Sequence, residues 1–282
     1  MKRCDGRLLK SISPFVKIIP YIMTRRSDAQ IFAKQIIAMD KIDAYLQAKK
    51  QQELNINYLH LFLALYVRII AERPQLNRFV MSNQLYARNG IYISMAVKRL
   101  LKDEGEETTV KFKFTGQEDI FEVAEIVNQT LANSTIAGNS TEADKIASRI
   151  MGLPYLLKKV LVGILKSLDK LNLLPCLIIE ASPFHTSLFF TYLKSIKLDY
   201  IYHHLYDFGT TSLFVALGKV KKMPVVENNT VIIKDCCEIG YTIDERICDG
   251  LYFANSLKLV KKYLENPYLL ETRLTKVKSD VD

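Results

Sequence analysis

The stretch TIDERICDG, residues 242–250, determines how the rest of the chain is interpreted. It follows a strand-like pattern and precedes a helical one, so its side chains are expected at the edge of a sheet. Three carboxylates, Asp244, Glu245 and Asp249, lie close to the Arg246 guanidinium. An aspartate cap and an arginine–carboxylate pair could hold such a turn without catalysis. The same crowding of titratable groups is also typical of active sites, and both interpretations stay open at this point.

On either side of this stretch, short β-rich runs predict a sheet. Val110, Phe112 and Phe114 alternate with lysines, as expected of a half-exposed strand. The same reasoning predicts strands at residues 91–97, 108–114, 176–179, 187–192 and 211–217. Residues 230–234 are expected to pair with residues 238–244, and Asn228–Asn229 suits a turn because asparagine tolerates a positive φ.

Apolar residues at helical spacing predict the other layer. The expected helices cover residues 28–50, 58–71, 118–130, 140–172 with a break at 152–154, and 249–266 before Pro267. Asp28 and Asn57 are expected to cap the first two. Residues 58–71 are apolar nearly all round, which predicts a helix buried between layers. The fold class is therefore α/β, with long helices on one face of a mixed sheet.

Composition narrows the class of protein. Gly (11) and Pro (8) are sparse and scattered, so no linker is predicted and residues 1–282 are read as a single domain. Five cysteines without C-x-x-C spacing favour neither a disulfide framework nor a metal site, and indicate reduced thiols in a cytoplasmic protein. The net charge is +9, but most lysines and arginines are interleaved with aspartates and glutamates, so no nucleic-acid partner is expected. Residues 58–71 are too short to span a bilayer, and no membrane partner is expected.

Residues 242–250 resemble the catalytic motif of the dihydrolipoyl acyltransferase domains of 2-oxo acid dehydrogenase complexes, which share a fold with chloramphenicol acetyltransferase. That motif reads D-H-R-x-x-D-G. Asp244, Arg246, Asp249 and Gly250 match it, and Glu245 stands in the place of the histidine. The resemblance thus implies a degenerate active site.

The resemblance extends along most of the chain. Five further segments are similar to the family, in the same order. Residues 19–21 and the helix expected after them resemble its first strand and helix, and the other four segments are residues 57–77, 190–193, 217–219 and 264–267. It implies a two-layer sandwich of the chloramphenicol acetyltransferase type. No lipoyl or peripheral-subunit-binding domain is expected before the fold, so the core subunit of a dehydrogenase complex is disfavoured.

The family's chemistry implies roles for several residues. Its histidine takes a proton from the thiol of coenzyme A or dihydrolipoamide, and a hydroxyl stabilises the oxyanion. Thr191 is the nearest match for that hydroxyl, with Ser187 and Ser195 as alternates. Asp249 and Gly250 would keep a structural role beside Asp244 and Arg246, and Asp249 is expected to pair with an arginine such as Arg246.

Glu245 is a weaker base than the histidine that the family has at this position. An unperturbed glutamate has a pKa of about 4.3 against about 6.5 for histidine, which is a loss of about 3 kcal/mol in driving force. Glu245 is expected to face a cavity, since an unpaired buried carboxylate is too costly. His203 and His204 are candidate substitute bases or ligand contacts, and on an extended stretch they would face opposite ways.

Two functions remain open. One is acyl transfer between coenzyme A, or another thiol, and an unknown acceptor, with no bound cofactor and no metal. The other is a non-catalytic trimeric scaffold, or a binder of acyl groups or small ligands. The resemblance implies a homotrimer with the site between subunits in either case.

Overall fold

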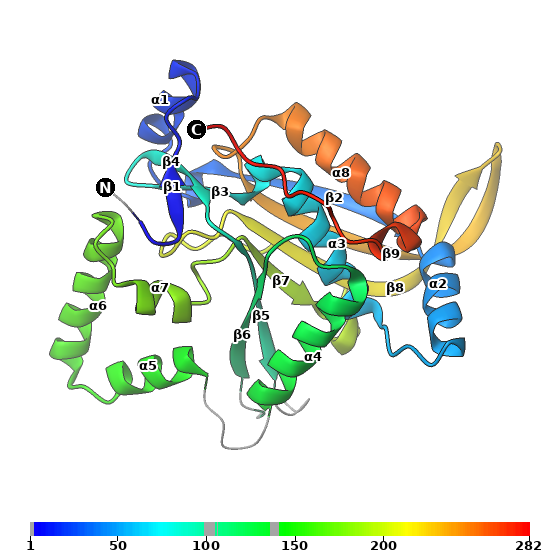
Figure 1. Ribbon diagram of the computed structural model, residues 1–282, viewed down its shortest axis with the longest axis horizontal. Coiled ribbons are helices and arrows are strands. Elements are labelled where there is room, and N and C mark those ends of the chain that lie inside the picture. The colour runs from blue at the N-terminus through cyan, green and yellow to red at the C-terminus, as the bar shows by residue number, and fades with distance from the viewer. Residues whose placement is uncertain (1–2, 99–104, 106, 136–140) are drawn as a thin grey trace.

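A computed structural model describes residues 3–98, 105, 107–135 and 141–282. Its centre is a six-stranded sheet in the order β2-β9-β8-β7-β5-β6 (Figure 1). The strands are β2 (Gln30–Ala38), β9 (Thr230–Asp244), β8 (Leu213–Glu227), β7 (Leu188–Tyr192), β5 (Ile91–Lys98) and β6 (Glu107–Phe114). Strand β7 runs parallel to both its neighbours and the other pairs are antiparallel, so the sheet is mixed as predicted.

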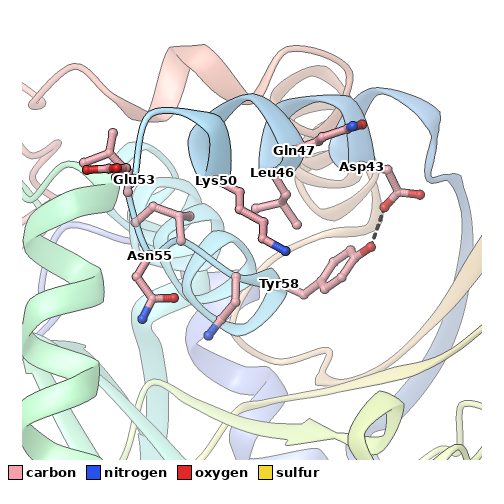
Figure 2. Close-up of a pocket in the computed structure, with 10 residues that line it drawn as sticks. Asp43, Leu46, Gln47, Lys50, Glu53, Asn55 and Tyr58 are labelled. Atoms are coloured by element: carbon pink, nitrogen blue, oxygen red, sulfur yellow. Dashed lines mark hydrogen bonds between the residues drawn. The ribbon is translucent and has the colours of Figure 1, made fainter.

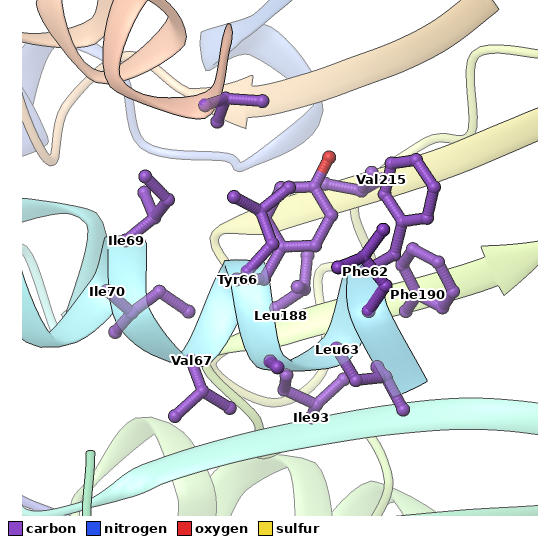
Figure 3. Packing of buried hydrophobic residues seen from close by; sticks show 14 of the residues in the cluster. Phe62, Leu63, Tyr66, Val67, Ile69, Ile70, Ile93, Leu188, Phe190 and Val215 are labelled. Carbon is purple, nitrogen blue, oxygen red and sulfur yellow. The ribbon is translucent and has the colours of Figure 1, made fainter. Parts of the chain in front are cut away.

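Helices α3 (Tyr58–Glu72), α4 (Ile120–Thr135) and α8 (Gly250–Glu265) pack against this sheet in one core. Helix α3 is buried at every position from His60 to Ala71, which confirms the prediction of a helix with neighbours on all sides. Figure 3 shows Phe62 and Tyr66 close to Phe190, Leu188 and Val215 of the sheet. Truncating such a buried phenylalanine to alanine costs about 3 to 5 kcal/mol. The α/β fold class is confirmed.

A second, three-stranded sheet in the order β1-β4-β3 was not predicted. Its strands are β1 (Gly6–Leu8), β4 (Gln84–Arg88) and β3 (Arg78–Met81). Helix α1 (Pro14–Ile22) packs beside it, starting at Ser13, whose hydroxyl accepts the N–H of Val16. Residues 19–21, which were likened to the first strand of the family, lie in this helix, so that alignment was wrong.

The predicted helix over residues 28–50 is wrong for residues 28–39 and confirmed for residues 40–50. Residues Ser27–Ala29 form a single 3₁₀ turn, β2 follows, and the helix α2 begins only at Asp40 and ends at Gln51. Nine consecutive residues of β2 pair with β9. The apolar positions of β2 fit both a helical and an alternating pattern, and the ladder with β9 decides between them. Phe32 and Ile36 are exposed on its outward side.

Two other segments differ from the predictions. Residues 176–179 lie in helix α7 (Cys176–Ala181) and not in a strand. Strand β9 is continuous from residue 230 to 244 and pairs with β8, which precedes it, rather than folding back on itself. The predicted turn is confirmed, with φ of 50° at Asn228 and 62° at Asn229.

The predicted break at residues 152–154 is confirmed, because it separates α5 (Glu142–Met151) from α6 (Tyr155–Lys170). Three further 3₁₀ turns are η2 (Pro74–Asn77), η3 (Leu193–Ile196) and η4 (Pro267–Leu270). None of the helices in the described ranges combines the length and the apolar character needed to cross a bilayer.

Candidate functional site

The segment 242–250 contains the end of β9, a tight connection over residues 245–249 and the first residue of α8. The N–H of Glu245 donates to the Ala29 carbonyl at 2.9 Å, so the main chain stays tied to the residue preceding β2. At the other end the Asp249 carboxylate caps α8 by accepting the N–H of Tyr252 at 2.8 Å. The segment is therefore held in a defined conformation at both ends.

The Asp244 carboxylate, which is fully buried, is the electrostatic centre of the segment. Arg246 donates to both of its oxygens at 2.7 Å through Nε and Nη2. On its other side lies Arg26, with Nε 3.5 Å from Oδ2. Burial lowers the pKa of Arg26, and the nearby Asp244 charge opposes this. The expected pairing of Asp249 with Arg246 was wrong, because Asp244 takes the arginine and Asp249, which is exposed, serves as a cap.

The side chain of Glu245 points to solvent, whereas its neighbours Asp244 and Arg246 are buried. A Cβ added at Gly250, also exposed, would meet nothing within 4 Å, so the glycine is not required sterically within one subunit. The segment thus presents Glu245 as its outward group.

A cavity of about 440 Å³ lies beside Arg246. Its basic lining is Arg25, Arg26, Lys170 and Arg246, and Asp207 is the acidic side chain among the lining residues. Arg26 is occupied by main-chain carbonyls, including that of Tyr206 at 2.6 Å, so the charge available to a ligand comes from Arg25 and Lys170. Glu245 does not line this cavity, and, as expected, it does not pack in the core. The cavity suits an anionic group.

Thr191 and Glu245 do not meet within one subunit. Thr191 lies half-buried on β7, in register with Ala216 of β8, which pairs with Gly240 of β9. Glu245 lies five positions beyond Gly240, which is roughly 17 Å along a strand. A site that uses both residues therefore needs two subunits.

The alternate hydroxyls are already engaged. The Ser187 hydroxyl accepts the N–H of Tyr92 at 3.0 Å and is buried. The Ser195 hydroxyl donates to the Tyr192 carbonyl at 2.7 Å. Thr191 is the one of the three that carries no such hydrogen bond in the described part of the chain.

The two adjacent histidines lie in different environments, as their alternation predicts. His203 is half-buried and stacks on Phe214, with ring centroids 4.2 Å apart and an interplanar angle of 17°. Its buried Nε2 has no hydrogen-bond partner among the described residues. Burial, and then the neighbouring His204, lower the pKa of His203. His204 is exposed and meets the edge of Tyr206.

A buried polar cluster around His185 was not predicted. His185 Nδ1 lies 2.9 Å from the Ser182 hydroxyl, and its Nε2 lies 3.2 Å from Asp169 Oδ2. Arg3 also reaches Asp169, at 3.1 Å. The order serine–histidine–aspartate is that of a hydrolase triad, but His185 is 1% exposed and the Ser182 hydroxyl also accepts the N–H of Phe184. The cluster braces the start of the chain against the end of α6, and no sequence spacing indicates it.

A cavity of about 510 Å³ lies where α2 meets the start of α3 (Figure 2). Tyr58 donates to Asp43 at its rim, and Lys50 and Leu46 line it. Burial, followed by the hydrogen bond to Asp43, raises the pKa of Tyr58. None of the candidate site residues lines this cavity.

The arrangement of one mixed sheet with α3, α4 and α8 on one face is the chloramphenicol acetyltransferase-like acyltransferase fold. Within it, residues 211–272, which include the whole segment 242–250, match the family model described as 2-oxoacid dehydrogenases acyltransferase (catalytic domain). The resemblance drawn from the motif is thereby confirmed. No curated protein matches the chain by sequence.

The solved structures that share this fold include the following three. A probable dihydrolipoamide acetyltransferase from Listeria monocytogenes 4b F2365 is 15% identical with a TM-score of 0.60, over 95% of this chain and 97% of that one. The cubic core of the pyruvate dehydrogenase multienzyme complex is 12% identical with a TM-score of 0.57, over 91% and 88%. A chloramphenicol acetyltransferase is 12% identical with a TM-score of 0.56, over 92% and 99%.

Proposed function

We propose that the protein transfers an acyl group between coenzyme A, or another thiol, and an acceptor, at a site shared between the subunits of a homotrimer. The observation that carries the proposal is the position of Glu245. It is the outward side chain of a segment fixed by the Asp244–Arg246 pair and the Asp249 cap, inside the region that matches the acyltransferase family model. A fixed main chain with one projecting carboxylate is a suitable geometry for a base.

In the proposed site Glu245 accepts the proton of the attacking thiol, and Thr191 of a neighbouring subunit donates to the oxyanion of the tetrahedral intermediate. Arg25 and Lys170 at the adjacent cavity would attract the phosphate groups of coenzyme A. His203, with its unpartnered Nε2, is the substitute base if Glu245 is not used.

A non-catalytic scaffold or acyl-binding protein is the second candidate. The exposure of Glu245 in a single subunit and its absence from the Arg246 cavity favour it. It predicts the same trimer, without turnover, and with or without ligand binding.

Light scattering tests the assembly, and a trimer is expected at micromolar concentration. A monomer would remove the shared site and the proposal with it.

Acyl exchange between acyl-coenzyme A and a small dithiol tests the chemistry. The wild-type protein should catalyse exchange and Glu245→Gln should lower the rate, by the 100-fold to 10,000-fold that is typical of losing a general base. Glu265→Gln, at another exposed glutamate, is the matched control and should leave the rate unchanged. Exchange that survives Glu245→Gln excludes Glu245 as the base.

A thermal-shift series separates the two candidates when no exchange is found. Coenzyme A at 100 times its Kd should raise the free energy of unfolding by about 2.7 kcal/mol. Stabilisation without turnover supports the binding protein, and no stabilisation supports the scaffold.

A further inference from the structure

Helix α6 carries an unusual outward face. Leu156, Val160 and Ile164 follow one another at intervals of four residues, and their exposed fractions are 72%, 59% and 48%. This spacing places them in one row along the helix. Leu171, seven residues beyond Ile164 and 55% exposed, continues the row past the end of α6. A row of large apolar side chains with this exposure is uncommon on a surface that faces only water.

Lysines border the row on one side. Lys159 and Lys166 are seven residues apart, so they share a helical face, about 100° to 120° round from Val160 at the middle of the row. Both are exposed, and among the described residues neither forms an ion pair. The one acidic residue of α6, Asp169, is buried and bound to Arg3 and His185. All the charge that α6 presents to its surroundings is therefore positive.

The position of α6 leaves this face accessible. It lies at the margin of the molecule, away from the six-stranded sheet (Figure 1). The cluster of Asp169, Arg3 and His185 anchors its last turn on the inner side, which fixes the apolar row on the outer side. A helix held in this way can lie flat against a surface without unfolding.

The charge distribution decides between possible occupants. A second copy of α6 packed face to face would bring Lys159 and Lys166 against the same lysines without a carboxylate to compensate them. A bilayer with anionic headgroups offers hydrocarbon to the apolar row and negative charge to the lysines at the same time. We infer that α6 is a membrane-surface helix that lies parallel to an anionic bilayer, with Leu156, Val160 and Ile164 inserted between the headgroups.

This inference concerns a peripheral contact. With 16 residues α6 is about 24 Å long, and it needs to enter the bilayer only to the depth of its apolar row. The expectation that the protein has no membrane partner was based on the length of residues 58–71, which bears on spanning and not on surface binding. The acyl-transfer proposal is independent of it.

Flotation with lipid vesicles tests the inference on the full chain. Vesicles of phosphatidylglycerol and phosphatidylcholine in equal parts should carry the protein, and vesicles of phosphatidylcholine alone should carry much less. Lys159→Gln combined with Lys166→Gln should lower partitioning into the anionic vesicles about 30-fold, because each basic residue near such a surface contributes about fivefold. The matched control, Lys258→Gln with Lys262→Gln on the exposed side of α8, should float as the wild type does.

The triple variant Leu156→Ser, Val160→Ser and Ile164→Ser tests the apolar row. It should abolish flotation while the circular dichroism spectrum is retained, since all three side chains are exposed. The inference is overturned if the wild-type protein does not float, or if both lysine pairs weaken flotation equally. It is also overturned if the triple variant floats normally. A triple variant that changes the oligomeric state of a protein that does not float would assign the row to contact between copies.

Discussion

Replacing Asp244 by asparagine should destabilise the protein more than any other single change in the segment 242–250. The substitution keeps the size of the side chain but removes the negative charge that Arg246 contacts at 2.7 Å and Arg26 at 3.5 Å. Both guanidinium groups are buried, with Arg246 4% and Arg26 5% exposed. Removing one partner of a buried ion pair costs about 3 to 5 kcal/mol because the remaining charge stays desolvated.

Two other aspartates provide the comparison. Asp249→Ala removes an exposed helix cap, which costs typically about 1 kcal/mol. Asp235, whose side chain is 49% exposed, forms a surface ion pair with Lys222. Asp235→Asn removes this pair, which costs about 0 to 1 kcal/mol. At roughly 2 to 4 °C per kcal/mol for a domain of this size, Asp244→Asn should lower the Tm by about 6 to 20 °C and Asp249→Ala by about 2 to 4 °C.

Urea unfolding followed by circular dichroism measures these differences as changes in midpoint at constant slope. An Asp249→Ala variant less stable than Asp244→Asn would refute the assignment of Asp244 as the centre of the segment. It would restore the pairing that the family motif implied.

Three further outcomes are expected. Glu245→His should leave the Tm unchanged, because the side chain is exposed, and should raise acyl exchange with a dithiol; a lower rate than that of the wild type would contradict the proposed role. Gly240→Ala should destabilise the fold because its Cβ would lie 2.9 Å from the Ile201 carbonyl oxygen. Gly250→Ala should not, because a Cβ there meets nothing within 4 Å. Equal Tm values for the two variants would count against the close approach of Gly240 to the main chain of Ile201. Burial lowers the pKa of His185 below the unfolded value of about 6.5, so the unfolded state binds more protons than the folded state. The free energy of unfolding should therefore fall as the pH drops below about 6.5. If urea titrations of a His185→Gln variant show the same dependence of stability on pH, other groups cause that dependence.

Helices whose apolar spacing and caps both indicate a helix could be predicted from the sequence. Helix α3 is apolar all round and Asn57 caps it through the N–H of His60. Helix α8 begins at the Asp249 cap and ends before Pro267. In both cases the local signals and the tertiary environment agree.

The prediction failed where a distant partner decides the structure. Residues 30–38 allow a helix or a strand, and their pairing with β9 is invisible to local patterns. The prediction of the ion pair in the candidate site failed for the same reason. Asp244 lies two residues before Arg246 and Asp249 three residues after it, so the sequence spacing does not choose between them. Only the burial of the end of β9, next to Arg26, selects Asp244.

The pairing of β2 with β9 has a consequence for synthesis of the chain. Tyr241 donates to Gln35 across 206 residues of sequence, and β9 is the only strand that pairs with β2 in the described structure. At a translation rate of 5 to 20 residues per second, β2 emerges from the ribosome roughly 10 to 40 seconds before that partner exists. During this interval its apolar residues and main-chain groups have no native contact. Protection of the nascent β2, by a chaperone or by transient helical structure, should therefore limit the yield of folded protein more than the stability of the finished sheet does.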